Sequence, residues 1–243
     1  NTNLVDATYL ISAVNNMFTN INITLDDIQS SWAGLRPLIH EEGKSASELS
    51  RKDEIFVSDT ELISIAGGKL TGYRKMAERI VDLVGKKYNR RFDKEFGEIK
   101  TKEIVLSGGT FKNSSEVKSY TDAIYNRINE VDFSQKDAEY LVHNYGKQTD
   151  IILKKFDELT DENQQEKMIK AEVWFTINYE MACNPTDFFM RRTGRLFFDA
   201  QSVHQYKSYV TQLFEHQLKW DKKVTNKNLD ELNKNLLSAL NFD

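Results

Sequence analysis

The chain has 243 residues, of which 40% are hydrophobic and 11% aromatic, which is enough apolar material for one or two domains with real cores and excludes a disordered chain. Its formal net charge of −4 gives no overall attraction to nucleic acid or to acidic membranes, so nucleic acid is not an expected partner. One cysteine excludes an intramolecular disulfide and fits a reducing cytoplasm, and no run approaches the roughly 20 apolar residues of a membrane span.

The first hundred residues combine helical and extended patterns. Apolar residues at helical spacing predict helices, and short continuous apolar runs predict strands. The predicted elements are a helix over residues 6–18, an extended stretch from residue 23, strands at 31–39, 55–57 and 62–65, and a helix from Leu70 to about Val84. This alternation predicts an α/β domain with an incomplete mixed sheet.

A short loop with two glycines and a lysine joins the last predicted strand to the helix that follows. Gly67 and Gly68 have no Cβ, which permits positive φ and lets a flat or charged ligand approach the main chain closely. The free N–H groups of the next helical turn attract anions, and Lys69 adds a mobile cation. The loop is therefore predicted to face a ligand. The alternative is a tight turn with a solvated lysine.

Two arginines of the same region are candidates for binding an anion. Arg36 stands among apolar neighbours, where a buried guanidinium needs a carboxylate, a phosphate or another hydrogen-bonding partner. Arg51 lies in the loop before the next predicted strand and could serve the same anion. The alternatives are a structural salt bridge for Arg36, to Glu41 or Glu42, and an exposed charge for Arg51.

Beyond residue 100 the periodicity is helical throughout. We therefore predict two domains, an α/β remainder at residues 1–100 and an all-α domain at residues 101–243. Asn184 and Pro185 predict a break, as an N-cap followed by proline at the first helical position. The predicted helices cover residues 117–128, 138–145, 149–159, about 163–183, a segment after Pro185 that buries residues 188, 189, 196 and 197, then 203–218 and 229–240.

Several other polar features have structural or solvent-exposed interpretations. The basic cluster at residues 86–91 is predicted to be a solvated loop, with contact to an anionic membrane surface as the alternative. Arg191 and Arg192 are predicted to pair with acidic neighbours, and Cys183 to be buried in an apolar helical stretch. The four histidines are scattered, so no metal site is predicted.

Blocks of sequence follow one another in a specific order. They are Ser-Trp-Ala-Gly-Leu-Arg-Pro-Leu at residues 31–38, Ser-Arg-Lys-Asp at 50–53, and Ala-Gly-Gly-Lys-Leu-Thr-Gly-Tyr-Arg-Lys-Met-Ala-Glu at 66–78, with Ala-Glu-Val, Tyr-Glu-Met-Ala-Cys and Thr-Asp-Phe-Phe-Met-Arg-Arg-Thr within 171–193. This order resembles the C-terminal portion of the aerobic, FAD-dependent glycerol-3-phosphate dehydrogenases of the DAO superfamily. The resemblance covers essentially the whole chain. It implies the α/β tail of an FAD-binding and substrate domain, followed by an all-α C-terminal domain.

The resemblance implies a substrate pocket and a reaction. Arg36 matches an active-site arginine that holds the substrate, and Arg51 and Lys69 match two further basic residues of the same pocket. Together they would neutralise a phosphate monoester. The implied reaction is the oxidation of sn-glycerol 3-phosphate to dihydroxyacetone phosphate, with hydride transfer from C2 of the substrate to the flavin.

The resemblance also assigns the glycine loop to the cofactor. In this family the matching backbone passes the flavin ring, where helix N-terminal amides stabilise its electron-rich edge as the ring is reduced. One departure is Gly72, where many relatives have Thr, so a side-chain hydrogen bond from this position is not expected. The implied cofactor-binding residues are Gly67, Gly68, Lys69, Leu70 and Thr71.

The electron acceptor is addressed by the spacing of two blocks. The related α-glycerophosphate oxidases share the first block but usually carry a long insertion before the Ser-Arg block. Here only residues 37–50 separate Arg36 from Arg51. That favours a dehydrogenase with a quinone acceptor over an oxidase that uses O2. A third alternative, from a different class, is a non-catalytic helical docking module.

The dinucleotide fingerprint Gly-x-Gly-x-x-Gly is missing from the sequence. We therefore expect a fragment that is inactive alone, with most of the FAD site outside this chain. The expected partners are glycerol 3-phosphate and a quinone, while a membrane surface and a homodimer are left open. The expected location is the cytoplasm, with attachment to the inner face of the cell membrane as the open alternative.

Overall fold

The computed structural model describes residues 2–35, 39, 43, 53–161 and 163–242. Residues 34–105 form one compact unit, the hairpin unit, and residues 1–33 join residues 106–243 in a second, the helical body. The domain boundary near residue 100 stays a prediction. The elements are α1 (Leu4–Met17), η1 (Leu25–Asp27), β1 (Asp53–Val57), β2 (Ile63–Gly67), η2 (Leu70–Gly72), α2 (Tyr73–Phe92), α3 (Ser114–Ile128), η3 (Asn129–Val131), α4 (Gln135–Tyr145), η4 (Gly146–Gln148), α5 (Thr149–Glu158), α6 (Gln164–Glu180), η5 (Asp187–Arg192), α7 (Arg195–Phe198), α8 (Ala200–Leu218) and α9 (Lys222–Leu240).

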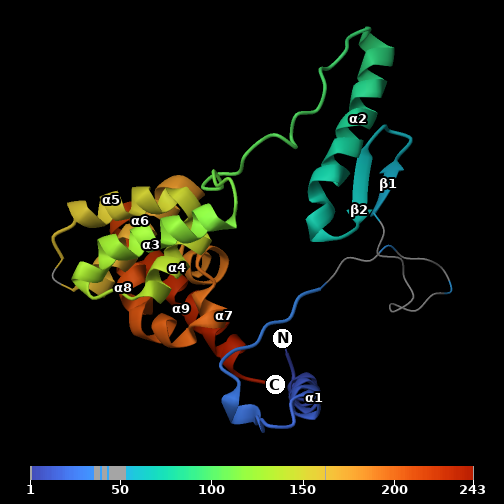
Figure 1. Cartoon of the computed structure of the whole chain (residues 1–243). Coiled ribbons are helices and arrows are strands. Elements are labelled where there is room, and N and C mark those ends of the chain that lie inside the picture. Colours follow the sequence, from blue (N-terminus) through green and yellow to red (C-terminus); the bar gives the residue numbers. More distant parts are fainter. Residues whose placement is uncertain (1, 36–38, 40–42, 44–52, 162, 243) are drawn as a thin grey trace. The chain divides into compact units, whose positions relative to one another are not determined.

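The hairpin unit pairs β1 with β2 in antiparallel fashion. Asp53 lies opposite Gly67 at one end of the pair, and Val57 lies opposite Ile63 at the other. The Ser58 N–H donates to the Leu62 carbonyl oxygen at 3.0 Å and closes the turn. Figure 1 shows α2 running alongside these strands, which packs one side of the helix against the hairpin.

The sequence predicts a mixed sheet and a strand at residues 31–39. Both predictions are wrong for the residues that the structure describes. The sheet among the described residues is antiparallel and contains β1 and β2. The Ser31 N–H instead donates to the Ala239 carbonyl oxygen at 2.7 Å, at the end of α9. The extended backbone before Gly34 therefore pairs with a helix end, which no local sequence pattern signals.

α2 continues past Val84, where the sequence analysis ended it, to Phe92. The basic cluster at residues 86–91 therefore lies on the last turns of a helix, and the prediction of a loop there is wrong. Arg90 and Arg91 stand in the last turn, where cations interact favourably with the helix dipole. Arg91 also pairs with Glu61 of the hairpin turn at 3.3 Å, which ties the end of the helix to the strands.

In the helical body, α6 contributes residues to two apolar clusters. Met168, Ala171 and Phe175 belong to the cluster that includes residues of α3, α4 and α5. Ile169 and Val173 belong to the cluster that includes residues of α8 and α9. All five side chains are 5% exposed or less. The described residues from 106 onward form helices and no strand, as the periodicity predicts.

The break after α6 is confirmed, but it begins earlier than residue 183. α6 ends at Glu180, and Met181 adopts a left-handed conformation with φ of 57°. The Asn184 side chain accepts the Asp187 N–H at 2.8 Å, the N-cap interaction that the Asn-Pro pair predicts. Cys183 lies between the two helices and is exposed, so its predicted burial is wrong.

Arg191 and Arg192, on the π-helical segment η5, form the structural ion pairs predicted for them. Arg191 Nη1 donates to Asp187 Oδ1 at 2.6 Å. Arg192 Nε lies 4.0 Å from Glu180 Oε2. Both arginines therefore stabilise the turn that follows α6.

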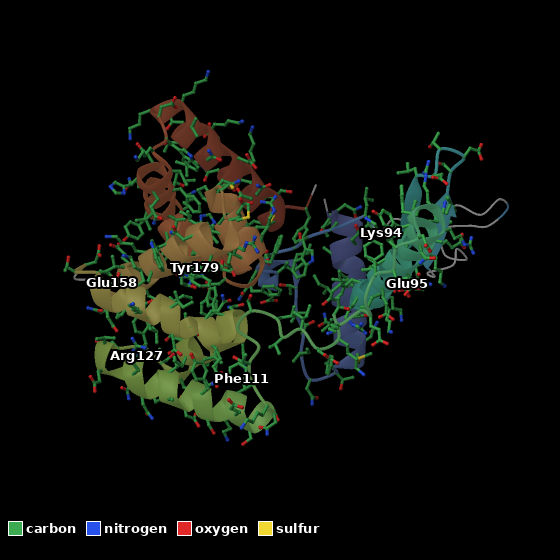
Figure 2. The ribbon with its side chains drawn as sticks, turned by 90° about the horizontal axis from the view of Figure 1, so that it is seen from above. Lys94, Glu95, Phe111, Arg127, Glu158 and Tyr179 are labelled. Carbon is green, nitrogen blue, oxygen red and sulfur yellow. The ribbon has the colours of Figure 1, made fainter. Side chains whose placement is uncertain are left out.

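Two glycines lock the chain that enters α3 onto the end of α4. The Lys147 N–H donates to the Gly108 carbonyl oxygen at 2.9 Å. A Cβ on Gly108 would lie 2.4 Å from the Tyr145 carbonyl oxygen, and one on Gly146 would lie 2.2 Å from the Gly108 oxygen. Phe111, labelled in Figure 2, then packs on Tyr120 with 5.6 Å between ring centroids. Only glycine fits this crossing, since both positions also have positive φ.

Candidate functional site

The junction between β2 and α2 has the backbone geometry that the sequence predicts. Gly67, the last residue of β2, and Gly68 have φ values of 78° and 79°. Lys69 returns to extended geometry, with φ of −98° and ψ of 145°, and precedes the short helix η2. The Gly72 N–H donates to the Lys69 carbonyl oxygen at 2.8 Å, and α2 begins at the next residue. The loop therefore turns sharply from strand to helix through two left-handed residues.

Gly68 also has a packing role. A Cβ there would lie 2.9 Å from Met76 Sδ and 3.1 Å from Asp53 Cβ. The glycine lets α2 approach the first residue of β1 closely. An ion pair between Asp53 and Arg79 also joins the first residue of β1 to α2. Tight packing alone thus accounts for part of the Gly-Gly pattern.

Lys69 differs from the basic residues that follow it on α2. Arg74 and Lys75 both pair with Glu78, at 3.0 and 2.7 Å, and Arg79 pairs with Asp53. Lys69 is exposed, and within the part of the chain that the structure describes it has no ion-pair partner. Its ammonium group is therefore available to an anion.

The surface of this loop is open and partly apolar. Leu70 is 89% exposed and Tyr73 is 57% exposed, and Thr71 is also exposed. The first N–H groups of a helix have no acceptor within that helix. Amides, a cation and an apolar side chain are thus presented together, a set suited to a planar ligand that carries negative charge.

The structure describes only part of the predicted site. Gly67, Gly68, Lys69, Leu70 and Thr71 are described and are neighbours in one loop. The two other predicted phosphate ligands, Arg36 and Arg51, lie outside the described residues. Within the described ranges, no cluster of His, Cys, Asp and Glu side chains suits a metal ion.

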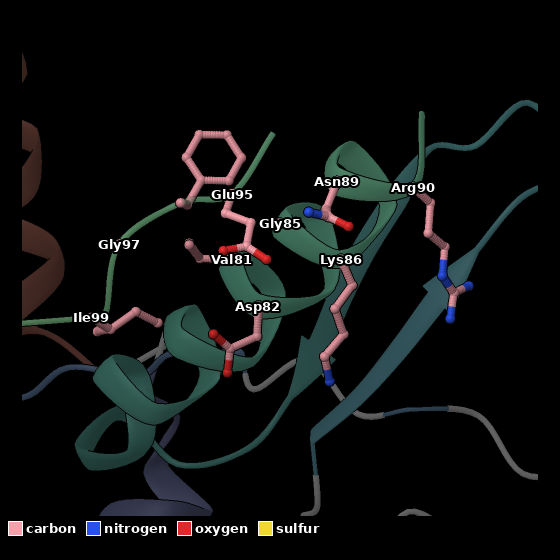
Figure 3. A pocket seen from close by; sticks show the side chains of 10 residues that line it. Val81, Asp82, Gly85, Lys86, Asn89, Arg90, Glu95, Gly97 and Ile99 are labelled. Atoms are coloured by element: carbon pink, nitrogen blue, oxygen red, sulfur yellow. The ribbon is translucent and has the colours of Figure 1, made fainter. Parts of the chain in front are cut away.

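A separate open groove of 350 Å³ runs along α2 and the segment after it (Figure 3). Asp82, Lys86 and Asn89 project from the helix, and Glu95 comes from the following segment. Its walls carry both signs of charge, so it offers no concentrated field for one ionic ligand. No residue of the predicted site lines it.

Sequence reasoning missed a buried polar cluster in the helical body, which we call the Glu172 cluster: Glu172, Arg195, Tyr140 and Tyr145. Glu172 Oε2 accepts from Arg195 Nη2 at 2.7 Å, and Oε1 accepts from the Tyr140 and Tyr145 hydroxyls at 2.8 and 2.9 Å. Glu172 is 0% exposed. The signal available in the sequence was a glutamate at a position where the helical repeat of α6 requires a buried residue.

The Glu172 cluster is fully paired, which makes it structural. Burial raises the pKa of the Tyr140 and Tyr145 hydroxyls, and the Glu172 carboxylate raises both further. Burial acts to lower the pKa of Arg195, but the charge of Glu172 and the interactions with Tyr140 and Tyr145 together outweigh it and hold that pKa above its ordinary value. The tyrosines therefore stay protonated donors and the arginine stays charged. The cluster offers no proton for chemistry near neutral pH.

Comparison with known proteins places these features in a family. The profile of the C-terminal domain of alpha-glycerophosphate oxidase matches residues 99–225. The aerobic glycerol-3-phosphate dehydrogenase of Bacillus subtilis (strain 168) is 47% identical over 238 residues, which are 97% of this chain and 43% of that protein. The protein of the same name from Staphylococcus saprophyticus is 40% identical over 211 residues, which are 86% of this chain and 38% of that protein.

A solved structure of a glycerol-3-phosphate dehydrogenase is also similar to this chain. The glycerol-3-phosphate dehydrogenase from Bacillus halodurans, complexed with FAD, matches with a TM-score of 0.83 and 35% identity. The match covers 99% of this chain and 46% of the solved chain. The chain thus spans less than half the length of the relatives it matches. The aerobic glycerol-3-phosphate dehydrogenase of Bacillus subtilis is similar to this chain along nearly all of its length. The chain therefore belongs to the family defined by the C-terminal domain of alpha-glycerophosphate oxidase.

Proposed function

We propose that the full-length protein is an FAD-dependent enzyme that oxidises sn-glycerol 3-phosphate to dihydroxyacetone phosphate. The observation that supports this most is the loop from Gly67 to Thr71, with two left-handed glycines and an exposed lysine without a partner among the described residues. The relatives that share nearly all of this chain are named aerobic glycerol-3-phosphate dehydrogenases.

The loop residues fit a flavin. Gly67 and Gly68 present no Cβ, so a ring system can lie against their backbone. Bound FAD supplies the hydride acceptor. The amides at the start of η2 and the Lys69 ammonium would place positive potential beside it, which stabilises negative charge. The part of the relatives' length that this chain does not span would supply the remainder of the cofactor site.

The substrate is held by charge. We assign the phosphate of glycerol 3-phosphate to Arg36, Arg51 and Lys69, because a phosphate monoester near charge −2 is bound best by several cationic donors. Arginine forks would fix its orientation, while Lys69 would act as a point charge at the edge of the flavin loop. In this proposal these residues bind and orient the substrate.

The electron acceptor is proposed to be a quinone. The short spacing between the blocks that carry Arg36 and Arg51 supports a dehydrogenase. The second candidate is an oxidase that uses O2, the kind of enzyme after which the matching family is named. Peroxide production separates them: hydrogen peroxide formed in a one-to-one ratio with substrate identifies the oxidase, and its near absence with a quinone analogue present identifies the dehydrogenase.

The direct test is the flavin spectrum of the purified full-length protein. Anaerobic addition of glycerol 3-phosphate should bleach the flavin absorbance within seconds, and glycerol without phosphate should leave it unchanged at the same concentration. A protein that carries FAD but keeps its oxidised spectrum with glycerol 3-phosphate would contradict the proposed reaction.

The proposed location is the cytoplasm, with the protein held at the inner face of the cell membrane, where quinones reside. No helix of the described chain is both long and apolar enough to cross a bilayer. Support for surface contact comes from the end of α2, where Lys86, Arg90 and Arg91 are exposed beside Phe92. Release of the protein from washed membranes by high salt would support this placement, and recovery in the soluble fraction at low salt would contradict it.

A further inference from the structure

An ion pair joins α2 to the end of the hairpin at which the glycine loop, residues 67–71, begins. Arg79, on the second turn of α2, pairs with Asp53, the first residue of β1. Asp53 is also the residue that lies opposite Gly67 in the strand pairing. We call Asp53 and Arg79 the loop-end pair. It acts on the residue from which the loop departs.

The next residue of the loop is enclosed by the same two elements. A Cβ on Gly68 would lie 3.1 Å from Asp53 Cβ and 2.9 Å from Met76 Sδ. Met76 and Arg79 are three positions apart and therefore lie on the same face of α2. Asp53 thus contacts the loop at both glycines, and one face of α2 holds Asp53 in place.

A second set of ion pairs joins α2 to the opposite end of the hairpin. Glu61, in the turn between β1 and β2, lies 3.3 Å from Arg91 Nη1 and 3.8 Å from Lys87 Nζ. We call these contacts the turn-end pairs. Arg79 and Arg91 are about 18 Å apart along the helix axis. The two ends of the hairpin can therefore be loosened separately.

The loop-end pair supplies a restraint that the loop sequence lacks. η2 begins at Leu70, directly after Lys69, so the direction of its first N–H groups depends on how the two glycines turn the chain. Glycine adopts many backbone conformations, so two glycines in succession do not fix a turn by themselves. The fixed neighbour is Asp53, which strand pairing holds opposite Gly67 and which Arg79 holds against α2. Donors that are ordered before a ligand arrives lose less freedom when it binds.

We infer that Arg79 is a positioning residue for the glycine loop: through Asp53 it fixes the turn whose amides face the flavin. The inference rests on the proposed function, which assigns this loop to FAD. Arg79 acts through Asp53 and is not itself assigned a contact with cofactor or substrate. It therefore differs in role from Lys69, whose ammonium is proposed to bind the phosphate.

A purely structural role for Arg79 predicts a different result. In that case Arg79→Gln would lower the stability of the hairpin unit as a whole, without a specific effect at the loop. Arg91→Gln is the matched control, because it removes the same charge from the same helix and breaks an ion pair to the same hairpin. Equal effects of the two variants on the loop indicate general loosening, and an effect of Arg79→Gln alone indicates positioning.

The first measurement needs no cofactor. Amide hydrogen exchange is followed in the full-length protein without FAD, for the peptide that contains residues 67–72. Its reporter is the Gly72 N–H, which donates to the Lys69 carbonyl oxygen at 2.8 Å. Arg79→Gln should speed this exchange about two- to fivefold, the range expected for a partly exposed ion pair. Arg79→Lys keeps the charge and should restore most of the protection, and Arg91→Gln should leave the peptide unchanged.

The second measurement is the dissociation constant of FAD from the full-length apoprotein, followed by flavin fluorescence. Arg79→Gln should raise this Kd about two- to fivefold, and Arg91→Gln should leave it unchanged. Tm is measured for each variant, so that a loss of stability is separated from a loss of affinity. If Arg79→Gln does not fold, Met76→Ala gives a second reading, because it removes the side chain beside Gly68 and keeps the ion pair.

Three results would overturn the inference. They are unchanged exchange of the loop in folded Arg79→Gln and Met76→Ala, an equal increase in Arg91→Gln, and faster loop exchange without any rise in the Kd for FAD. Failure of the proposed function gives a different pattern. The unaltered protein would then take up no FAD, while the loop would still exchange faster in Arg79→Gln than in Arg91→Gln, which supports the positioning and contradicts flavin as the ligand.

Discussion

Glu172 and Arg195 form an ion pair of 2.7 Å inside the helical body, with the glutamate side chain 0% and the arginine side chain 14% exposed. Glu172 belongs to α6, the helix that contributes to both apolar clusters, and Arg195 begins α7. The two tyrosines that share the carboxylate come from α4. The Glu172 carboxylate on α6 therefore links α4, which contributes to one apolar cluster, to α7, which contributes to the other.

Replacing Glu172 by Ala should destabilise the helical body strongly. The change leaves the Arg195 guanidinium and two tyrosine hydroxyls buried without their acceptor, and breaking a buried pair on one side costs about 3–5 kcal/mol. Urea unfolding monitored by circular dichroism would measure the loss. Glu215→Ala is the matched control, since Glu215 pairs with Lys222, whose side chain is 83% exposed, and should cost less than about 1 kcal/mol. Equal losses in the two variants would contradict a special role for the buried pair.

Gly146→Ala should destabilise the connection between residue 108 and the end of α4. The new Cβ would lie 2.2 Å from the Gly108 carbonyl oxygen, at a position with φ of 55°. Strained backbone of this kind costs on the order of 1–3 kcal/mol before the clash is counted. Differential scanning calorimetry should show a clear fall in Tm. Gly97→Ala, where a Cβ meets nothing within 4 Å, should leave Tm nearly unchanged.

Lys69→Ala should lower kcat/KM for glycerol 3-phosphate. The ammonium has no partner among the described residues, so its loss should leave the fold intact, and under the proposed function it removes one contact to the phosphate. One charge-assisted hydrogen bond contributes about 1.5–3 kcal/mol, which corresponds to about 10- to 150-fold. Lys75→Ala removes an exposed lysine paired with Glu78 on the same unit and should change kcat/KM less than twofold. Steady-state kinetics with comparable effects in both variants would count against the assignment.

Glu180 should make stability depend on pH in the acidic range. Burial raises its pKa above the ordinary 4.5, and nearby Glu172 adds to the rise, although Arg192 opposes it. The folded state therefore holds this proton more tightly than the unfolded state, so stability falls as pH rises from about 4.5 through the raised pKa. Glu180→Gln should flatten this part of the curve of unfolding free energy against pH. An unaltered curve in the variant would show that the half-buried carboxylate does not contribute.

Sequence reasoning found the elements that are determined by residues close to one another in the sequence. Helices after residue 113 follow from apolar spacing, and the break after α6 follows from Asn184 and Pro185. The left-handed backbone at Gly67 and Gly68 follows from the absence of Cβ. In each case the signal and the structure lie within a few residues of each other.

The features that sequence reasoning missed depend on residues that are far apart in the sequence. The run before Gly34 has an extended pattern, but its partner is the carbonyl of Ala239, about two hundred positions away in the sequence. The burial of Glu172 depends on Arg195 and on two tyrosines of another helix. Of the predicted phosphate ligands, Lys69 is exposed and its role stays a prediction, while Arg36 and Arg51 lie outside the described residues.

The bond from the Ser31 N–H to the Ala239 carbonyl has a consequence for how the protein is made. A ribosome synthesises residue 31 long before residue 239, and domains fold as their chain emerges. The Ser31 N–H therefore lacks its hydrogen-bond acceptor until α9 has been translated and has packed. Contacts of such long sequence separation form late in folding, so the segment around Ser31 would be among the last parts of a nascent chain to reach its native contacts.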